Sequence, residues 1–201
     1  IKSKGWRVER RVACMYSRVL IPSIFEEKYE RSLYLDADTL VIGDISALDE
    51  VELKYEIAAL PNFACFAQHK AKNSYQFEKW DRPDRELLNY DSINSGVVLF
   101  NNKKWIENEM TSKFIEVIND DRISAKFVVQ GYMSIILEGK FDYLDERYNK
   151  SLSSDISFLN MDNRIVHYIG GRRWKKPWEY GETNLRYINY WKQNYLDGKI
   201  L

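Results

Sequence analysis

The chain is 201 residues long, which is enough for one domain with a substantial hydrophobic core. Its 30 Lys and Arg residues balance 30 Asp and Glu residues, which excludes a basic field for nucleic acid and an acidic excess typical of disorder. With 2 Cys residues there is no disulfide framework, and no stretch reaches the length of a membrane span. We therefore expect a single cytoplasmic domain over residues 1–201, with no nucleic-acid partner.

The first predicted elements lead to a pair of carboxylates. Apolar residues at helical spacing predict a helix within residues 10–29, which Pro22 ends or kinks. Residues 33–42 are apolar and rich in β-branched and aromatic side chains, and they predict a buried strand that carries Asp36 and Asp38. Positions two apart share a face of an extended chain. Because like charges repel unless a cation or a proton lies between them, the pair predicts a site for a hard divalent cation.

Two other interpretations of this pair stay open. Asp residues at strand ends commonly serve in turns or as helix caps. Phosphatases of the haloacid dehalogenase type also end an apolar strand with two Asp residues two apart, followed by Gly and then Thr. Here Thr39 follows Asp38 directly, without an intervening Gly. A phosphatase that uses Asp36 as its nucleophile is therefore the less favoured alternative.

The remaining chain alternates between strand-like and helix-like segments. The expected elements, in order, are a helical turn at 45–48, a strand at 57–60, a long loop at 67–91, a polar corner followed by a strand at 93–102, helices at 105–118 and 127–137, a strand or turn at 141–144, a strand at 163–169 and a helix at 185–196. This alternation indicates the α/β class.

His167 stands near the end of the last predicted strand, before Gly170, Gly171 and a basic run that includes Lys176. A lone His near a strand is most often a hydrogen-bonded core residue. Backbone N–H groups at a glycine corner, together with Lys or Arg side chains, can bind a phosphate. The segment therefore predicts an anion site, with a solvated basic loop as the alternative.

Together these motifs resemble glycosyltransferase family 8, which includes bacterial lipopolysaccharide galactosyl- and glucosyltransferases and glycogenin. The resemblance extends from about Val12 to Trp178. It rests on seven segments in a fixed order: Tyr16-Ser17-Arg18, Tyr34-Leu35-Asp36-Ala37-Asp38, Asn94-Ser95-Gly96-Val97, Gln130, Tyr148-Asn149, His167-Tyr168-Ile169-Gly170 and Lys176-Pro177-Trp178.

The resemblance implies a fold of the nucleotide-diphospho-sugar transferase (GT-A) type, a mixed sheet flanked by helices. In the family, a first strand and helices that bind uridine precede the position of Arg18, so the N-terminal strands are expected to be missing here. The implied activity is a metal-dependent retaining transfer of glucose or galactose from a UDP-sugar. The implied acceptor is a glycan or lipid-linked saccharide such as lipopolysaccharide.

The resemblance also implies roles for individual residues. Asp36, Asp38 and His167 would hold Mn²⁺, with Mg²⁺ as the alternative, and the donor set of two carboxylates and an imidazole suits Mn²⁺. Gln130 would be the catalytic residue near the anomeric carbon. The residues implied to bind the donor are Arg18, Ala37, Asn94, Ser95, Gly96, Gly170 and Lys176.

Two features depart from the family pattern or extend beyond it. Gln130 lies between Val129 and Gly131, where the family commonly has Asp on both sides. This favours, as the alternative function, a non-catalytic relative that binds a glycan or a nucleotide sugar. Residues 185–201 predict an amphipathic helix rich in Tyr, Trp and Lys, which packs on the sheet edge or, as a further hypothesis, contacts the inner face of the membrane.

Overall fold

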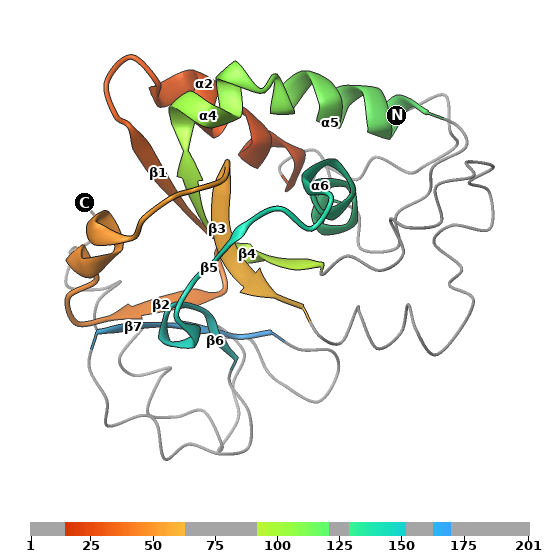
Figure 1. Cartoon of the computed structure of the whole chain (residues 1–201). Helices are drawn as coiled ribbons and strands as arrows, with labels where there is room; N and C mark the ends of the chain where they lie inside the picture. The colour runs from red at the N-terminus through yellow and green to blue at the C-terminus, as the bar shows by residue number, and fades with distance from the viewer. Residues whose placement is uncertain (1–14, 63–91, 121–128, 152–162, 170–201) are drawn as a thin grey trace. The chain divides into compact units, whose positions relative to one another are not determined.

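The structure of the chain is a computed structural model, and it describes residues 15–62, 92–120, 129–151 and 163–169 (Figure 1). The chain divides into two compact units, one formed by Ile1–Tyr34 and Asp49–Leu144 and the other by Leu35–Leu48 and Asp145–Leu201. Each unit is described by itself below. The expectation of a single domain stays a prediction.

The first unit contains a four-stranded sheet in the order β1-β4-β3-β5. Its strands are β1 (Arg31–Leu35), β3 (Ile57–Pro61), β4 (Ile93–Asn101) and β5 (Asp142–Tyr143). Strand β3 pairs antiparallel with β4 and parallel with β5, so the sheet is mixed. The pairing of β3 with β4 shifts register between Ala59 and Leu60, opposite the polar beginning of β4.

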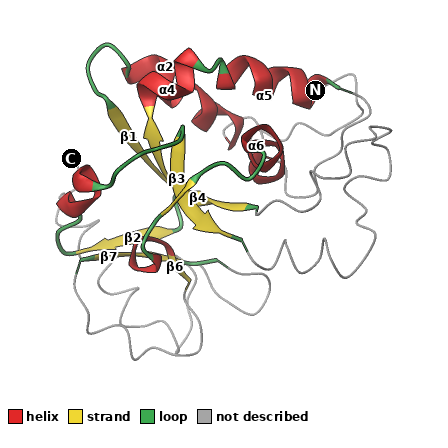
Figure 2. Cartoon of the chain, in the orientation of Figure 1, coloured by secondary structure: helices red, strands yellow, loops and turns green. Residues whose placement is uncertain are grey.

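Helices pack beside this sheet, as Figure 2 shows. They are the 3₁₀-helix η2 (Ser17–Leu20) and the α-helices α2 (Ile21–Phe25), α4 (Asn102–Glu107), α5 (Met110–Asn119) and α6 (Val129–Leu137). Helix α6 contacts β4, and α5 contacts both α6 and η2. The apolar residues that face inward from these elements form one hydrophobic cluster, in which Trp105 meets Phe100 edge to face with ring centroids 5.1 Å apart.

The second unit contains a three-stranded mixed sheet in the order β2-β7-β6. Its strands are β2 (Thr39–Ile42), β6 (Lys150–Ser151) and β7 (Arg164–His167), and β7 is antiparallel to β2 and parallel to β6. The 3₁₀-helices η3 (Ser46–Glu50) and η5 (Glu146–Asn149) follow β2 and precede β6, respectively. The central position of β7 explains why all of its residues are buried.

The combination of mixed sheets and helices confirms the predicted α/β class. The strands expected at 57–60, 93–102 and 163–169 and the helix expected at 127–137 correspond to β3, β4, β7 and α6. The helical turn expected at 45–48 is η3, and the strand or turn at 141–144 is β5. The loop expected at 67–91 and the helix expected at 185–196 lie outside the described residues.

Three expectations about element boundaries were wrong. Residues 33–42 form two strands, β1 and β2, rather than one buried strand, because a turn at residues 36–39 separates them. The helix expected over 105–118 is broken between α4 and α5, where Glu109 has a φ of 53°. Pro22 does not end the helical segment, because it lies in the first turn of α2, where its missing N–H group is not needed.

Within the part of the chain that the structure describes, no helix has the length and apolar character that a membrane span requires.

Candidate metal site and donor-site residues

The two carboxylates lie on a tight turn between β1 and β2. The backbone N–H of Thr39 donates to the carbonyl of Asp36 at 3.1 Å, which is the bond that closes a β-turn. The Thr39 hydroxyl donates to the same carbonyl at 2.8 Å. The turn therefore holds Asp36 and Asp38 close together through the backbone and one side chain, with Ala37 exposed between them.

His167 comes to the same place through the pairing of β7 with β2. Thr39 and His167 are partners in this antiparallel ladder, so the end of β7 lies beside the beginning of β2. The N–H of Tyr168 extends the contact by donating to the carbonyl of Asp38 at 2.9 Å. The sequence placed the carboxylates on one predicted strand and His167 near the end of another, but the register of the sheet is what brings His167 to the carboxylates.

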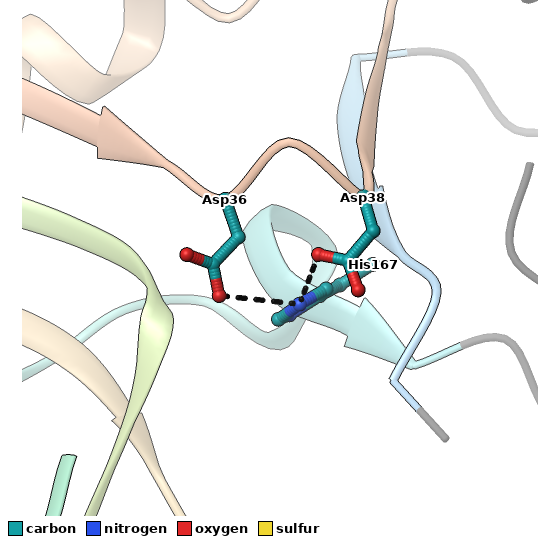
Figure 3. Close-up of side chains that lie close together, drawn as sticks. All are labelled: Asp36, Asp38 and His167. Atoms are coloured by element: carbon teal, nitrogen blue, oxygen red, sulfur yellow. Dashed lines mark ion pairs between the residues drawn. The ribbon is translucent and has the colours of Figure 1, made fainter. Parts of the chain in front are cut away.

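The imidazole presents Nε2 to both carboxylates, as Figure 3 shows. Nε2 of His167 lies 3.2 Å from Oδ1 of Asp38 and 3.9 Å from Oδ2 of Asp36. One ligand atom from each of the three residues lies within 4.8 Å of the others. The His167 side chain is 6% exposed and the Asp36 side chain 30%, so one edge of the group is open to a ligand.

This donor set fits a divalent cation. Two carboxylate oxygens and one imidazole nitrogen are accepted by Mn²⁺ and similar first-row metals, whereas an all-oxygen set would favour Mg²⁺ or Ca²⁺. Such a cation would also offset the repulsion between two neighbouring carboxylates. Among the described residues, this is the one group of three or more His, Cys, Asp or Glu side chains that could hold a metal ion.

Three other predicted site residues meet within the first unit. Nη1 of Arg18 donates to the carbonyl of Ser95 and, at 3.0 Å, to its hydroxyl. The N–H of Ser95 donates to Oε1 of Gln130 at 3.2 Å. Ser95 is therefore the common partner of Arg18 and Gln130, and the guanidinium of Arg18 also lies 4.2 Å from the centre of the Tyr34 ring.

The segment Asn94-Ser95-Gly96 is strand rather than the expected corner, because all three residues belong to β4. The Asn94 carboxamide oxygen accepts from the N–H of Gly96 at 3.0 Å. This bond lies where the pairing of β4 with β3 shifts register. It explains why a segment of a strand has the residue types of a turn.

Val129, the departure beside Gln130, is fully buried and belongs to the hydrophobic cluster of the first unit. It lies at the start of α6, and Gln130 and Gly131 follow in the same helix. Gly170 and Lys176 lie outside the described residues, so their predicted roles stay predictions.

Two residues in contact with the metal-site group were given no role by sequence reasoning. The position of Thr39 counts against a phosphatase, and its hydroxyl supports the turn. Asn149 was part of a motif without a function, and its Oδ1 lies 2.8 Å from Nδ1 of His167. The position of Asn149 in the pair Tyr148-Asn149 was the only available signal, since no local pattern indicates its partner.

Comparison with known proteins identifies the relatives of this chain. The profile of the family described as "Glycosyl transferase family 8" matches residues 8–182. The lipopolysaccharide 1,2-glucosyltransferase of Escherichia coli K12 is 31% identical over 175 residues, which are 82% of this chain and 48% of that protein. General stress protein A of Bacillus subtilis is 26% identical and is matched over 89% of this chain and 66% of its own length.

Solved structures show the same fold. The galactosyltransferase LgtC in complex with donor and acceptor sugar analogues matches with a TM-score of 0.60 at 20% identity, over 88% of this chain and 64% of that chain. Apo glycosyltransferase GlyE of Streptococcus pneumoniae matches with a TM-score of 0.55 at 21% identity, over 89% and 46%. These likenesses confirm the predicted GT-A type fold. The chain spans about half the length of the lipopolysaccharide glycosyltransferases that it matches.

Proposed function

The chain belongs to glycosyltransferase family 8, and from this membership we propose that it transfers glucose or galactose from a UDP-sugar to a hydroxyl group of a glycan or lipid-linked saccharide acceptor. We propose further that the transfer retains the anomeric configuration and depends on a divalent cation. The acceptor class follows the relatives, since several of them are lipopolysaccharide glucosyl- or galactosyltransferases.

The observation that carries the proposal is the convergence of Asp36, Asp38 and His167, whose ligand atoms lie within 4.8 Å of one another. These residues would hold Mn²⁺, with Mg²⁺ as the alternative. A cation bound there supplies positive charge to the diphosphate of the donor, whose negative charge increases as the sugar departs. The turn closed by Thr39 keeps the two carboxylates together before the donor arrives.

Residues of the first unit would bind the sugar part of the donor. Ser95 joins Arg18 and Gln130 in one hydrogen-bonded group, so the Gln130 carboxamide is held in place through Ser95. We propose that Gln130 lies near the anomeric carbon and that Arg18, Asn94 and Ser95 line the donor site. Gly170 and Lys176 would bind the diphosphate through a backbone N–H and an ammonium group.

Calorimetric titration of UDP into the protein, with Mn²⁺ and then with EDTA, tests the nucleotide site. We expect binding that requires the metal and is lost in Asp38→Asn, which keeps the size of the side chain but removes its charge. Asp49→Asn is the matched control, because Asp49 is an exposed carboxylate outside the metal-site group. Absence of UDP binding by the folded wild-type protein would contradict the proposal.

A non-catalytic relative that binds a nucleotide sugar is the second candidate, and Val129 favours it. This apolar residue is fully buried where the family commonly has an acidic one, so it offers no carboxylate to a sugar hydroxyl. Release of UDP from UDP-glucose or UDP-galactose, measured with and without acceptor, separates the two. Turnover supports the transferase, whereas binding without turnover supports the second candidate. Membership in a glycosyltransferase family argues against the phosphatase interpretation of Asp36.

A further inference from the structure

Asn149 makes a buried contact with the metal-site histidine on the side away from the carboxylates. Its Oδ1 lies 2.8 Å from Nδ1 of His167, and the two residues are 3% and 5% exposed. The other ring nitrogen, Nε2, is the one that faces Asp36 and Asp38. The imidazole therefore lies between a carboxamide and a pair of carboxylates.

The strand order explains this arrangement. Strand β7, which ends with His167, is the central strand of its sheet, between β2 and β6. The turn that carries the carboxylates leads into β2, and Asn149 immediately precedes β6, whose Ser151 is the parallel partner of His167. The segments that precede the two neighbouring strands therefore bring two carboxylates to one ring nitrogen and a carboxamide to the other.

The backbone around Asn149 is held by its own contacts. Asn149 is the last residue of η5, and the Asp145 side chain caps that helix by accepting from the N–H of Arg147 at 3.0 Å. The N–H of Tyr148 donates to the Asp145 carbonyl at 2.9 Å, and the Tyr148 side chain is buried. This support fixes the position from which the Asn149 side chain reaches His167.

The polarity of the contact determines which ring nitrogen carries the proton. A carboxamide oxygen only accepts hydrogen bonds, so Nδ1 of His167 must donate in this pair. In a neutral imidazole with a proton on Nδ1, Nε2 keeps its lone pair. A metal ligand needs that lone pair, and Nε2 is the nitrogen directed at the two carboxylates.

We propose that Asn149 is a positioning residue that fixes His167 in the Nδ1–H tautomer and directs the Nε2 lone pair to the cation held with Asp36 and Asp38. The inference rests on the proposed function for its metal. It adds a residue that acts on the cation through its contact with His167 rather than as a ligand. A merely structural Asn would be needed for stability but would leave the tautomer and the metal affinity unchanged.

Two substitutions separate these roles. Asn149→Leu keeps the branched shape and removes the acceptor, and Asn149→Asp keeps an acceptor oxygen in the same position. The chain has 2 His residues, so ¹⁵N-histidine spectra are simple, and His167→Gln assigns the signals. Spectra of the metal-free protein report directly which ring nitrogens carry a proton. Titration with Mn²⁺ alone, followed by electron paramagnetic resonance, reports the affinity.

We expect a proton on Nδ1 in the wild-type protein and in Asn149→Asp, whether or not the neighbouring carboxylates also hold a proton on Nε2. In Asn149→Leu we expect the Nε2–H tautomer and an Mn²⁺ affinity about 10–100-fold weaker, the effect typical of losing such an outer partner. If Asn149→Leu does not fold, Asn149→Ser replaces it, because the shorter side chain withdraws its hydroxyl from Nδ1.

An unchanged tautomer together with an Mn²⁺ affinity within about twofold of wild type would overturn the inference. Failure of the proposed function gives a different result, namely a wild-type protein that binds no Mn²⁺ at all. The metal-free spectra decide in either case whether Asn149 orients His167.

Discussion

Arg18 and Ser95, 77 positions apart in the sequence, are joined by two hydrogen bonds from one guanidinium nitrogen, to the carbonyl and to the hydroxyl of Ser95. Both residues were predicted to bind the donor. The contact shows that they also organise each other, because Ser95 in turn donates to Gln130. A change at Arg18 should therefore affect the fold of this unit as well as the binding of a ligand.

Replacement of Arg18 by Met should destabilise the protein. Arg18 is 1% exposed, and its guanidinium donates to the carbonyls of Met15 and Ser95, so Met fills the space but leaves buried acceptors without this donor. We expect a loss of about 2–4 kcal/mol in the free energy of unfolding, measured in urea. Lys28→Met removes an exposed cation that lies over Tyr29 and should change stability by less than about 0.5 kcal/mol. Equal effects of the two variants would contradict the prediction.

Thr39→Val should weaken metal binding without removing a ligand. The substitution keeps the β-branched shape that suits the first residue of β2 and removes the hydroxyl that donates to the Asp36 carbonyl. Because the turn then holds Asp36 and Asp38 less firmly, we expect the affinity for Mn²⁺ to fall about tenfold. Thr39→Ser retains the hydroxyl and serves as the control. If both variants bind Mn²⁺ like the wild-type protein, the hydroxyl does not support the site.

Thr111 connects three elements of the first unit through its hydroxyl. It accepts from Nε1 of Trp105 at 2.9 Å and donates to the carbonyl of Val19 at 2.9 Å. Thr111→Val removes both bonds at nearly constant volume, and the fully buried Trp105 loses the acceptor for its N–H. We expect a loss of about 1–3 kcal/mol in the free energy of unfolding, while Thr111→Ser stays close to wild type. A loss of equal size in Thr111→Ser would assign the effect to the methyl group instead.

Gly43, at the end of β2, should tolerate no side chain. Its φ is 74°, and an added Cβ would lie 2.7 Å from Oδ1 and 2.8 Å from the backbone N of Asn163. Since the N–H of Asp44 donates to the same Asn163 Oδ1, the clash would also disturb that bond. We expect Gly43→Ala to lower the free energy of unfolding by about 1–3 kcal/mol. Asn tolerates positive φ better than Ala does. A loss of stability in Gly43→Asn nearly equal to that in Gly43→Ala would therefore show that the clash with Asn163 is the main cause. Wild-type stability in Gly43→Asn would contradict the predicted clash.

Tyr16 should make stability fall at high pH. Burial, with a smaller contribution from Tyr132, raises the pKa of Tyr16 from 10.0 to about 12. Above pH 10 the unfolded chain loses this proton while the folded protein keeps it, so the unfolded state binds fewer protons and the free energy of unfolding decreases until about pH 12. After allowance for partial exposure, we expect the wild-type protein to lose roughly 1–2 kcal/mol more than Tyr16→Phe over this interval. Parallel curves from urea unfolding at several pH values would contradict the prediction.

The predictions of secondary structure were confirmed where the pattern of apolar side chains alone determines the element. The buried strands β3 and β4 and the helix α6 follow from continuous apolar runs and from helical spacing. The division of residues 33–42 was missed, because both strands are apolar and the turn between them lacks Gly and Pro. The break at Glu109 was missed for a similar reason, since a positive φ at a non-glycine residue leaves no mark in the apolar pattern.

The sequence by itself determined the family and the chemical types at the site, because Asp36, Asp38 and His167 stand in ordered motifs whose residue types specify a donor set for a divalent cation. Only the tertiary structure decided how these groups meet. The partnership of Thr39 with His167 in β2 and β7, and the place of Asn149 before β6, follow from strand pairing between distant segments. The periodicity of a sequence shows which face of a strand is buried. Which strands pair with one another depends on the packing of the whole unit.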